Sequence, residues 1–275
     1  MPLTFDALLG CLELVEDGPG LTGANLDIGY HRVFGGQVLA QALVAGAAAV
    51  PDKSVKSIHV LFPGEGDAAR PLHYRATPLR SGRTFASVEV VAHQEEKVVA
   101  AALVSAHADE PGPERNEDPP ETGGPDRATP QDLGMVPWET RVVDDVDLAD
   151  PGVGPARLDW WSRTPPLGAV GSVPERALHQ ALLAHATDLT LIGTALRPFE
   201  GVSQADSTVT LQTAVTSHTL WFHRPFRVDE WLLVTQEAPV VAHGRSFGRG
   251  DVFSGDALVA SFAQEAMVRR MDATG

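Results

Sequence analysis

Residues 35–50 read GGQVLAQALVAGAAAV, and small or apolar side chains lie on nearly every side of the helix that this segment predicts. A helix that is apolar all round has no face suited to water, so we expect it to be buried. After Pro51 the sequence changes to β-branched, partly alternating runs separated by turn residues, a pattern typical of strands. These runs are VKSIHVLF (55–62), PLHYRAT (71–77), RTFASVEVVAH (83–93) and KVVAAALVSAH (97–107).

The second half of the chain repeats this order. The segment GRTFA at 82–86 recurs as GRSFG at 244–248, 162 residues later (244 minus 82). A second helix-like segment, VPERALHQALLAHATDLTLIG at 173–193, again precedes strand-like runs. An internal period of this length, present in two copies, indicates a duplicated domain rather than a solenoid.

One buried helix followed by an antiparallel meander predicts a hotdog fold, in which a sheet wraps around a central helix, and argues against alternating βαβ units. Two copies predict an α+β tandem double hotdog with two antiparallel sheets, whose edges pair so that fewer strand edges stay exposed. A stretch rich in Pro, Gly and acid divides the chain and should be exposed. We therefore expect an N-terminal hotdog at 1–110, an acidic Pro/Gly-rich linker at 111–150 and a C-terminal hotdog at 151–275.

Composition excludes several classes of protein. The formal net charge is -15 and the pI is near 5.0, which argues against nucleic-acid binding through Lys and Arg. The single cysteine, Cys11, excludes an intrachain disulfide, fits a reducing cytoplasm and reads as a packed hydrophobe. No apolar run approaches the roughly 20 residues of a membrane helix, and the N-terminus lacks a basic segment typical of signal peptides. We expect a soluble, cytoplasmic protein without a membrane partner.

Two short motifs resemble known sites but lack their context. GPGLTG at 18–23 fits a dinucleotide-binding pattern, yet it contains proline and follows a helix-like acidic segment, where the pattern requires a strand. GRSFG at 244–248 fits the pattern of a serine nucleophile, but no histidine follows Ser246. The ten histidines show no HExxH spacing, so no metal site is predicted.

Several segments, taken together and in order, resemble the bacterial and peroxisomal type II (TesB-like) acyl-CoA thioesterase family. The resemblance covers nearly the whole chain outside the acidic linker, and it implies hydrolysis of fatty-acyl-CoA to a free fatty acid and CoA. It implies no separate cofactor, because coenzyme A is part of the substrate, and it leaves a homo-oligomer possible. The matching segments are VFGGQV (33–38), HQALL (179–183) running into Asp188, WFHRPF (221–226) and LVAS (258–261) running into Gln264.

The family holds and activates water with an aspartate, a hydroxyl residue and a glutamine. The aspartate corresponds to Asp188 and the glutamine to Gln264, both in the second half, but the hydroxyl position holds Val215. Two residues are candidates for the missing hydroxyl. Ser217 shares a face with Val215 on a regular strand, whereas Thr216 turns inward only if the strand contains a bulge.

The remaining substrate contacts are predicted at glycines and arginines. The amides of Gly36 and Gln37, at the start of the first buried helix, are candidate donors for the thioester oxyanion. Arg83 and Arg224 are candidates for binding the CoA phosphates, with solvated surface as the alternative. The first helix carries no acid where Asp188 falls in the second, so one active site per chain is expected.

Two other functions stay open at this point. A non-catalytic acyl-CoA-binding protein is favoured by the valine at 215. A hotdog enoyl-CoA hydratase or dehydratase is less favoured, because residues 34–37 (FGGQ) contain neither the aspartate nor the histidine that those enzymes place at the start of the helix. The sequence fixes neither acyl chain length nor oligomeric state.

Overall fold

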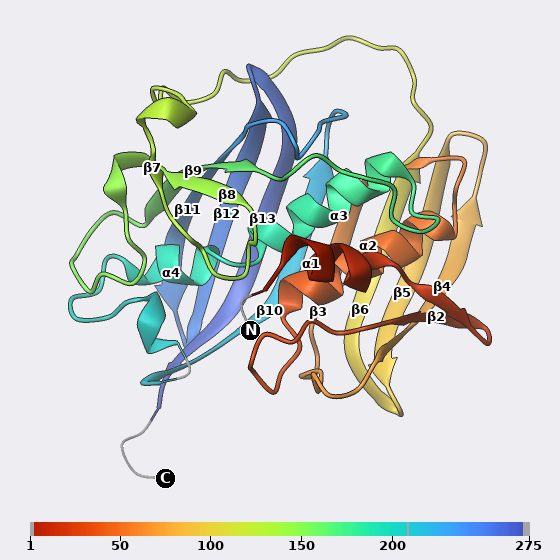
Figure 1. The fold of residues 1–275 in the computed structure, drawn as a ribbon, viewed down its shortest axis with the longest axis horizontal. Helices are drawn as coiled ribbons and strands as arrows, with labels where there is room; N and C mark the ends of the chain where they lie inside the picture. The colour runs from red at the N-terminus through yellow and green to blue at the C-terminus, as the bar shows by residue number, and fades with distance from the viewer. Residues whose placement is uncertain (1–2, 208, 272–275) are drawn as a thin grey trace.

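Two buried helices set the architecture of the computed structural model, which describes residues 3–207 and 209–271. Helix α2 spans Gly35–Ala48 and helix α3 spans Glu175–Thr187, and they pack against each other (Figure 1). They run antiparallel, because the first turn of α2 contacts the last turn of α3. Nearly every residue of both helices is buried, as the absence of a polar face in the first helix requires.

A single 13-stranded sheet wraps around this helix pair. Strands β3–β6 follow α2, and strands β10–β13 follow α3. The two meanders join where β3 pairs antiparallel with β10, with Ser57 opposite Trp221 and Leu61 opposite Ser217. The predicted tandem double hotdog with edge-to-edge pairing is confirmed. The strands are β3 (Ser54–Leu61), β4 (Leu72–Ser81), β5 (Phe85–Gln94), β6 (Lys97–His107), β10 (Leu211–Phe222), β11 (Leu232–Ala242), β12 (Arg245–Ser254) and β13 (Ala257–Arg270).

Shorter elements extend the sheet and cover the helices. The order across the sheet is β1-β2-β4-β5-β6-β3-β10-β13-β12-β11-β9-β8-β7. Cys11 is buried in α1, and burial raises the pKa of its thiol to about 12, so it is a packed hydrophobe rather than a nucleophile. These elements are α1 (Phe5–Leu12), β1 (Val15–Asp17), β2 (Gly20–Gly23), η1 (Pro125–Arg127), β7 (Thr129–Pro130), β8 (Glu139–Val142), η2 (Val143–Asp145), β9 (Arg157–Arg163), α4 (Leu191–Leu196) and η3 (Gln204–Asp206).

The stretch between the two meanders has two parts. Residues 109–124 are extended and largely exposed, and they arch over the top of the molecule in Figure 1. From η1 onward the chain folds back, and β7 and β8 add to the sheet beyond β9. Val136 and Val142 are buried there. The second part of the segment read as linker therefore belongs to the C-terminal sheet.

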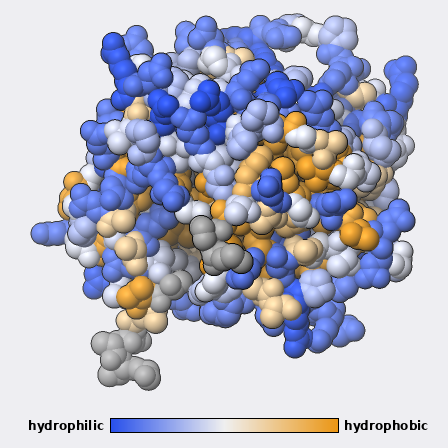
Figure 2. Space-filling view, viewed as in Figure 1, coloured by the Kyte–Doolittle hydropathy of each residue, from blue (hydrophilic) through white to orange (hydrophobic). Residues whose placement is uncertain are grey.

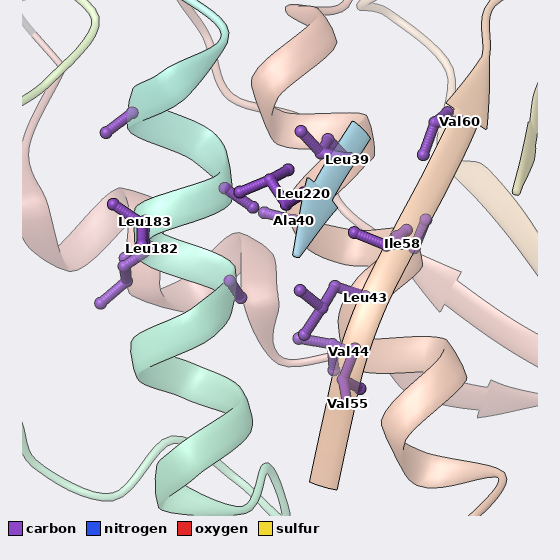
Figure 3. Close-up of a cluster of buried hydrophobic side chains, with 14 of the residues drawn as sticks. Leu39, Ala40, Leu43, Val44, Val55, Ile58, Val60, Leu182, Leu183 and Leu220 are labelled. Carbon is purple, nitrogen blue, oxygen red and sulfur yellow. The ribbon is translucent and has the colours of Figure 1, made fainter. Parts of the chain in front are cut away.

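The two halves share one hydrophobic core. Figure 3 shows Leu39 and Leu43 of α2 close to Ile58 of β3 and Leu220 of β10, and Leu182 belongs to the same core cluster on the neighbouring helix α3. On the face seen in Figure 2, hydrophilic residues cover most of the surface, and hydrophobic ones gather over the central helices. No helix in the described ranges is long and apolar enough to cross a membrane. A core that continues across the β3–β10 junction should make the halves unfold together.

Leu182→Ala tests this shared core. Leu182 is fully buried in the core cluster that both halves share, so we expect a loss of about 2–5 kcal/mol from the free energy of unfolding. All five tryptophans lie beyond residue 137, so their fluorescence reports the C-terminal half, whereas far-UV circular dichroism reports both. The two denaturation curves should coincide. The control, Leu103→Ala on the exposed sheet surface, should change stability by no more than about 0.5 kcal/mol. Two separate transitions in the wild type would contradict a shared core.

His185 ties the returning segment to α3. Its ring is fully buried, and Nε2–H donates to the Met135 carbonyl oxygen at 2.8 Å. The ring also packs edge-on against Phe34, with centroids 5.1 Å apart. Burial lowers the pKa of His185 to about 4, so the ring is neutral at pH 7.

This burial predicts a pH dependence of stability. Between pH 6.5 and 4 the unfolded chain takes up a proton at His185 and the folded chain does not, so stability falls as the pH falls. The full effect near pH 4 is about 3 kcal/mol. His185→Gln keeps a donor for Met135 but cannot titrate, so its stability should fall less than that of the wild type over this range. Parallel curves of unfolding free energy against pH would refute this assignment.

Candidate active site

The carboxylate of Asp188 is held at the C-terminal end of α3 by the side chain of Gln264 on β13. Gln264 Nε2 donates to Asp188 Oδ1 at 3.0 Å and lies 3.2 Å from the Asp188 carbonyl oxygen. Asp188 is 4% exposed and Gln264 is 2% exposed. The structure thus brings together the two residues that the family resemblance singled out, although 76 positions separate them in the chain.

The other carboxylate oxygen faces the start of α2. A Cβ built on Gly35 would lie 2.7 Å from Asp188 Oδ2, which is too close for any side chain. A Cβ on Gly36 would lie 2.5 Å from the His185 carbonyl oxygen. The two glycines therefore allow the helices to approach closely, and the first turn of α2 carries the positive end of its dipole toward the carboxylate.

An apolar cavity of about 530 Å³ opens beside Asp188, and Gln264 is not among its lining residues. Gly35 also lines it, as do Arg32 and Glu65, which form an ion pair of 2.9 Å. Arg32 is the only Lys or Arg among the described lining residues. The apolar lining residues include Ile28, Val33, Val38, Phe62, Val99, Leu189, Ile192, Val215 and Met267.

A β-bulge in β10 decides which side chains reach the cavity. Val215 pairs with Ala266 and Ser217 pairs with Glu265, so Thr216 is the extra residue. Thr216 lines the cavity, and its hydroxyl donates to the Glu265 carbonyl oxygen at 3.0 Å. The expectation that Ser217 shares a face with Val215 assumed a regular strand. The bulge places Ser217 beside Glu265 on the outer face of the sheet, away from Asp188.

The candidate oxyanion donors differ in their availability. The Gln37 amide donates to the Phe34 carbonyl oxygen at 3.1 Å, within the first turn of the helix. The Gln37 side chain is also committed, since its Oε1 accepts from the Leu26 amide at 2.9 Å. The Gly36 amide, in contrast, donates to no acceptor within residues 3–207 and 209–271. The structure therefore leaves the Gly36 amide unbonded in the described part of the chain, although neither Gly36 nor Gln37 is among the residues that line the cavity.

The two arginines predicted to bind phosphate lie far from the cavity. Arg83 is exposed in the turn between β4 and β5. Arg224 follows β10, where its Nη1 donates to the Leu258 carbonyl oxygen at 2.9 Å. Val215 and Arg224 lie toward opposite ends of β10, roughly 20 Å or more apart at the rise of a strand. Neither arginine lines the cavity that contains Asp188.

Sequence reasoning missed two polar residues behind Asp188. His218 Nδ1 lies 3.1 Å from Gln264 Nε2 and 3.4 Å from Asp188 Oδ1. Its Nε2 lies 3.1 Å from Thr187 Oγ1. Nothing in the sequence shows that His218 on β10 pairs directly with Gln264 on β13.

The opposite end of the helix pair has the same geometry without the polar groups. The segment QALVAGAAAV at 41–50 matches QALLAHATDL at 180–189, so Ala49 takes the place of Asp188. Both residues cap their helices with similar dihedral angles, φ -73° and ψ -15° for Ala49 and φ -77° and ψ -16° for Asp188. The carboxylate is thus present at one end only.

The strands show the same asymmetry. Val60 pairs with Ala102 as Leu220 pairs with Phe262. Two residues later in the chain, Val104 on β6 corresponds to Gln264 on β13. Two residues earlier, Ile58 on β3 corresponds to His218 on β10. The positions equivalent to Asp188, Gln264 and His218 are therefore all apolar in the first half.

Comparison with known proteins agrees with this geometry. Residues 24–107 match the family described as acyl-CoA thioesterase N-terminal domain, and residues 109–268 match acyl-CoA thioesterase C-terminal domain. Acyl-CoA thioesterase 2 of Haemophilus influenzae is 32% identical over 272 residues, covering 90% of this chain and 91% of that protein. Human acyl-coenzyme A thioesterase 8 is 29% identical over 279 residues, covering 90% and 83%.

Solved structures show the same relationship over the whole fold. The acyl-CoA thioesterase II TesB2 of Mycobacterium marinum superposes with a TM-score of 0.79 at 29% identity, covering 98% of this chain and 99% of that one. The tesB protein of Mycobacterium avium subs paratuberculosis gives a TM-score of 0.81 at 26% identity, covering 96% and 99%. With both halves matched in order, this chain belongs to the acyl-CoA thioesterase family.

Proposed function

We propose that this chain hydrolyses the thioester of fatty-acyl-CoA to a free fatty acid and CoA, with a water activated by Asp188. The observation that carries the proposal is the buried Asp188–Gln264 pair, whose Asp188 lines an apolar cavity. A thioester is already an activated acyl group, so a carboxylate acting as general base suffices and no covalent nucleophile is needed. Coenzyme A enters as part of the substrate, and the reaction uses no separate cofactor.

The two oxygens of Asp188 have different tasks in this mechanism. Oδ1 accepts the hydrogen bond from Gln264, which fixes the carboxylate. Oδ2 takes a proton from the water as the water oxygen attacks the thioester carbon. The negative charge moves to the carbonyl oxygen, where the Gly36 amide and the positive end of α2 stabilise it. When the C–S bond breaks, the proton on Asp188 passes to the CoA sulfur.

Thr216 supplies the hydroxyl that Val215 lacks. Because the Thr216 hydroxyl hydrogen is directed to Glu265, its oxygen can only accept a hydrogen bond. A water that donates one hydrogen to Thr216 and the other to Asp188 keeps a lone pair for the thioester carbon. Loss of one positioned hydrogen bond typically lowers the rate by a factor of about 10² to 10³.

The cavity offers different surroundings to the acyl chain and to the CoA part of the substrate. Its aliphatic wall suits an acyl chain, and Arg32, the only cation among the lining residues that the structure describes, is paired with Glu65. In this arrangement Arg32 contacts a CoA phosphate through a charge-assisted bond, in place of the distant Arg83 and Arg224. Free thiol released from acyl-CoAs of graded length would define the acyl chain.

A non-catalytic acyl-CoA-binding protein is the second candidate, favoured by Val215 in the position of the family's hydroxyl. That function predicts tight acyl-CoA binding without release of free thiol. A direct thiol assay with bound and free acyl-CoA measured in parallel separates the two candidates.

Asp188→Asn tests the general base. The amide oxygen of asparagine still accepts from Gln264, so the fold should be retained, but the side chain cannot take a proton. We expect the turnover number to fall by about 10² to 10⁴ with acyl-CoA binding preserved. The exposed Asp256→Asn is the control and should behave as the wild type. An unchanged turnover number in Asp188→Asn, measured as released thiol, would refute the mechanism.

Gly35→Ala tests the close approach of α2 to the carboxylate. The new Cβ would lie 2.7 Å from Asp188 Oδ2, so the carboxylate must move, and we expect the turnover number to fall by about 10- to 100-fold. Gly10→Ala in α1 is the matched control, because its Cβ meets nothing within 4 Å. The control should keep full activity and gain up to about 1 kcal/mol of stability. Full activity of Gly35→Ala would show that Oδ2 is not the reacting oxygen.

A further inference from the structure

His218 is a fully buried polar residue that the proposed hydrolysis does not use. It lies on β10 between Thr187 at the end of α3 and Gln264 on β13. On its face the ring stacks on Phe262, with an interplanar angle of 3° and centroids 6.2 Å apart. Among the residues that the structure describes, Asp188 is the only carboxylate that forms an ion-pair contact with the ring, 3.4 Å from Nδ1.

The hydrogen bonds fix which nitrogen of His218 carries the proton. The Thr187 hydroxyl has one hydrogen and donates it to the Ala184 carbonyl oxygen at 3.0 Å. Toward His218 Nε2 it can therefore only accept, so Nε2 carries the hydrogen. In the neutral ring Nδ1 is then an acceptor, and it receives one hydrogen of the Gln264 amide at 3.1 Å.

The second hydrogen of that amide is directed to Asp188 Oδ1 at 3.0 Å. Gln264 Nε2 also lies 3.2 Å from the Asp188 carbonyl oxygen, so the orientation of the Gln264 amide depends on His218 and Asp188 together. With its amide turned over, the oxygen of Gln264 would face the lone pair of His218 Nδ1 and the oxygens of Asp188, which is a repulsive arrangement. The ring therefore reinforces the amide orientation that binds the carboxylate.

We propose that Thr187 and His218 are positioning residues, which act through Gln264 to hold the Asp188 carboxylate with Oδ2 free. On one side, His218 Nε2–H donates to the Thr187 hydroxyl, which donates to the Ala184 carbonyl oxygen. On the other side, the Gln264 amide donates to both His218 Nδ1 and Asp188 Oδ1. This inference rests on the proposed function, because its effect on rate passes through Asp188.

The first half of the chain shows which side chains occupy the equivalent positions. Ile58 takes the place of His218 there, and Ala48 takes the place of Thr187 by the helix match. His218→Ile removes the acceptor for Gln264 with the side chain that the equivalent position holds. Thr187→Val removes the hydroxyl at nearly constant volume, whereas Thr187→Ser retains it.

The experiment measures turnover number, KM and the pH profile of released thiol for these variants. We expect His218→Ile to lower the turnover number about 100-fold and Thr187→Val about 10-fold, both with KM within twofold of wild type. Thr187→Ser should recover wild-type turnover. In both impaired variants the acidic limb should move to higher pH, because a carboxylate that loses a donor holds its proton more readily. A general loss of packing would not shift this limb or be rescued by serine.

Nitrogen-15 spectra of histidine-labelled wild type at pH 7 provide a readout that is independent of activity. Hydrogen at Nε2 of His218 is the expected result, and hydrogen at Nδ1 would overturn the relay whatever the turnover. Wild-type kinetics in Thr187→Val, together with an inactive Asp188→Asn, would overturn the relay and leave the hydrolase standing. An active Asp188→Asn would instead remove the proposed function, and the spectra would still decide the tautomer.

Discussion

The structure depends on the close contact between the first turn of α2 and the last turn of α3. Side chains are absent from this contact on the α2 side, since a Cβ on Gly35 or Gly36 would lie within 2.7 Å of α3 atoms. The contact sets the helices antiparallel and places the positive end of one helix dipole against the carboxylate that closes the other. The β3–β10 junction then follows, because each sheet wraps around its own helix and the helices are already side by side.

Much of the fold follows from the sequence because its signals are local. A helix without a polar face must be buried, and a meander must wrap it; the repeated GRTFA and GRSFG segments show that this happens twice. Strands β7 and β8 give no such signal, since together they comprise six residues in a Pro- and acid-rich stretch. They are strands because β9 offers them an edge, which is a property of the folded sheet.

The two residues of the proposed active site and the residues around them also differ in how far the sequence predicts them. Asp188 and Gln264 were identified by family resemblance, but their contact joins elements 76 residues apart. The β10 bulge could only be posed as an alternative, because a shift of one residue exchanges the two faces of a strand and the partner strands decide the register. His218 could not be recognised from its neighbours in sequence. Its partners, Thr187 and Gln264, are 31 and 46 positions away.

The two ends of the helix pair show why the polar residues occur together. Burying a polar group is unfavourable unless its hydrogen bonds are satisfied, and each member of this cluster satisfies another. Replacing one alone by its first-half counterpart would leave a buried donor or acceptor without a partner, as isoleucine at 218 would do to Gln264. The first half avoids this because all four positions are apolar there, with Ala48, Ala49, Ile58 and Val104. The core is therefore stable when all four positions are polar and bonded to one another, or when all four are apolar. The second half of this duplicated fold has the first arrangement, and the first half has the second.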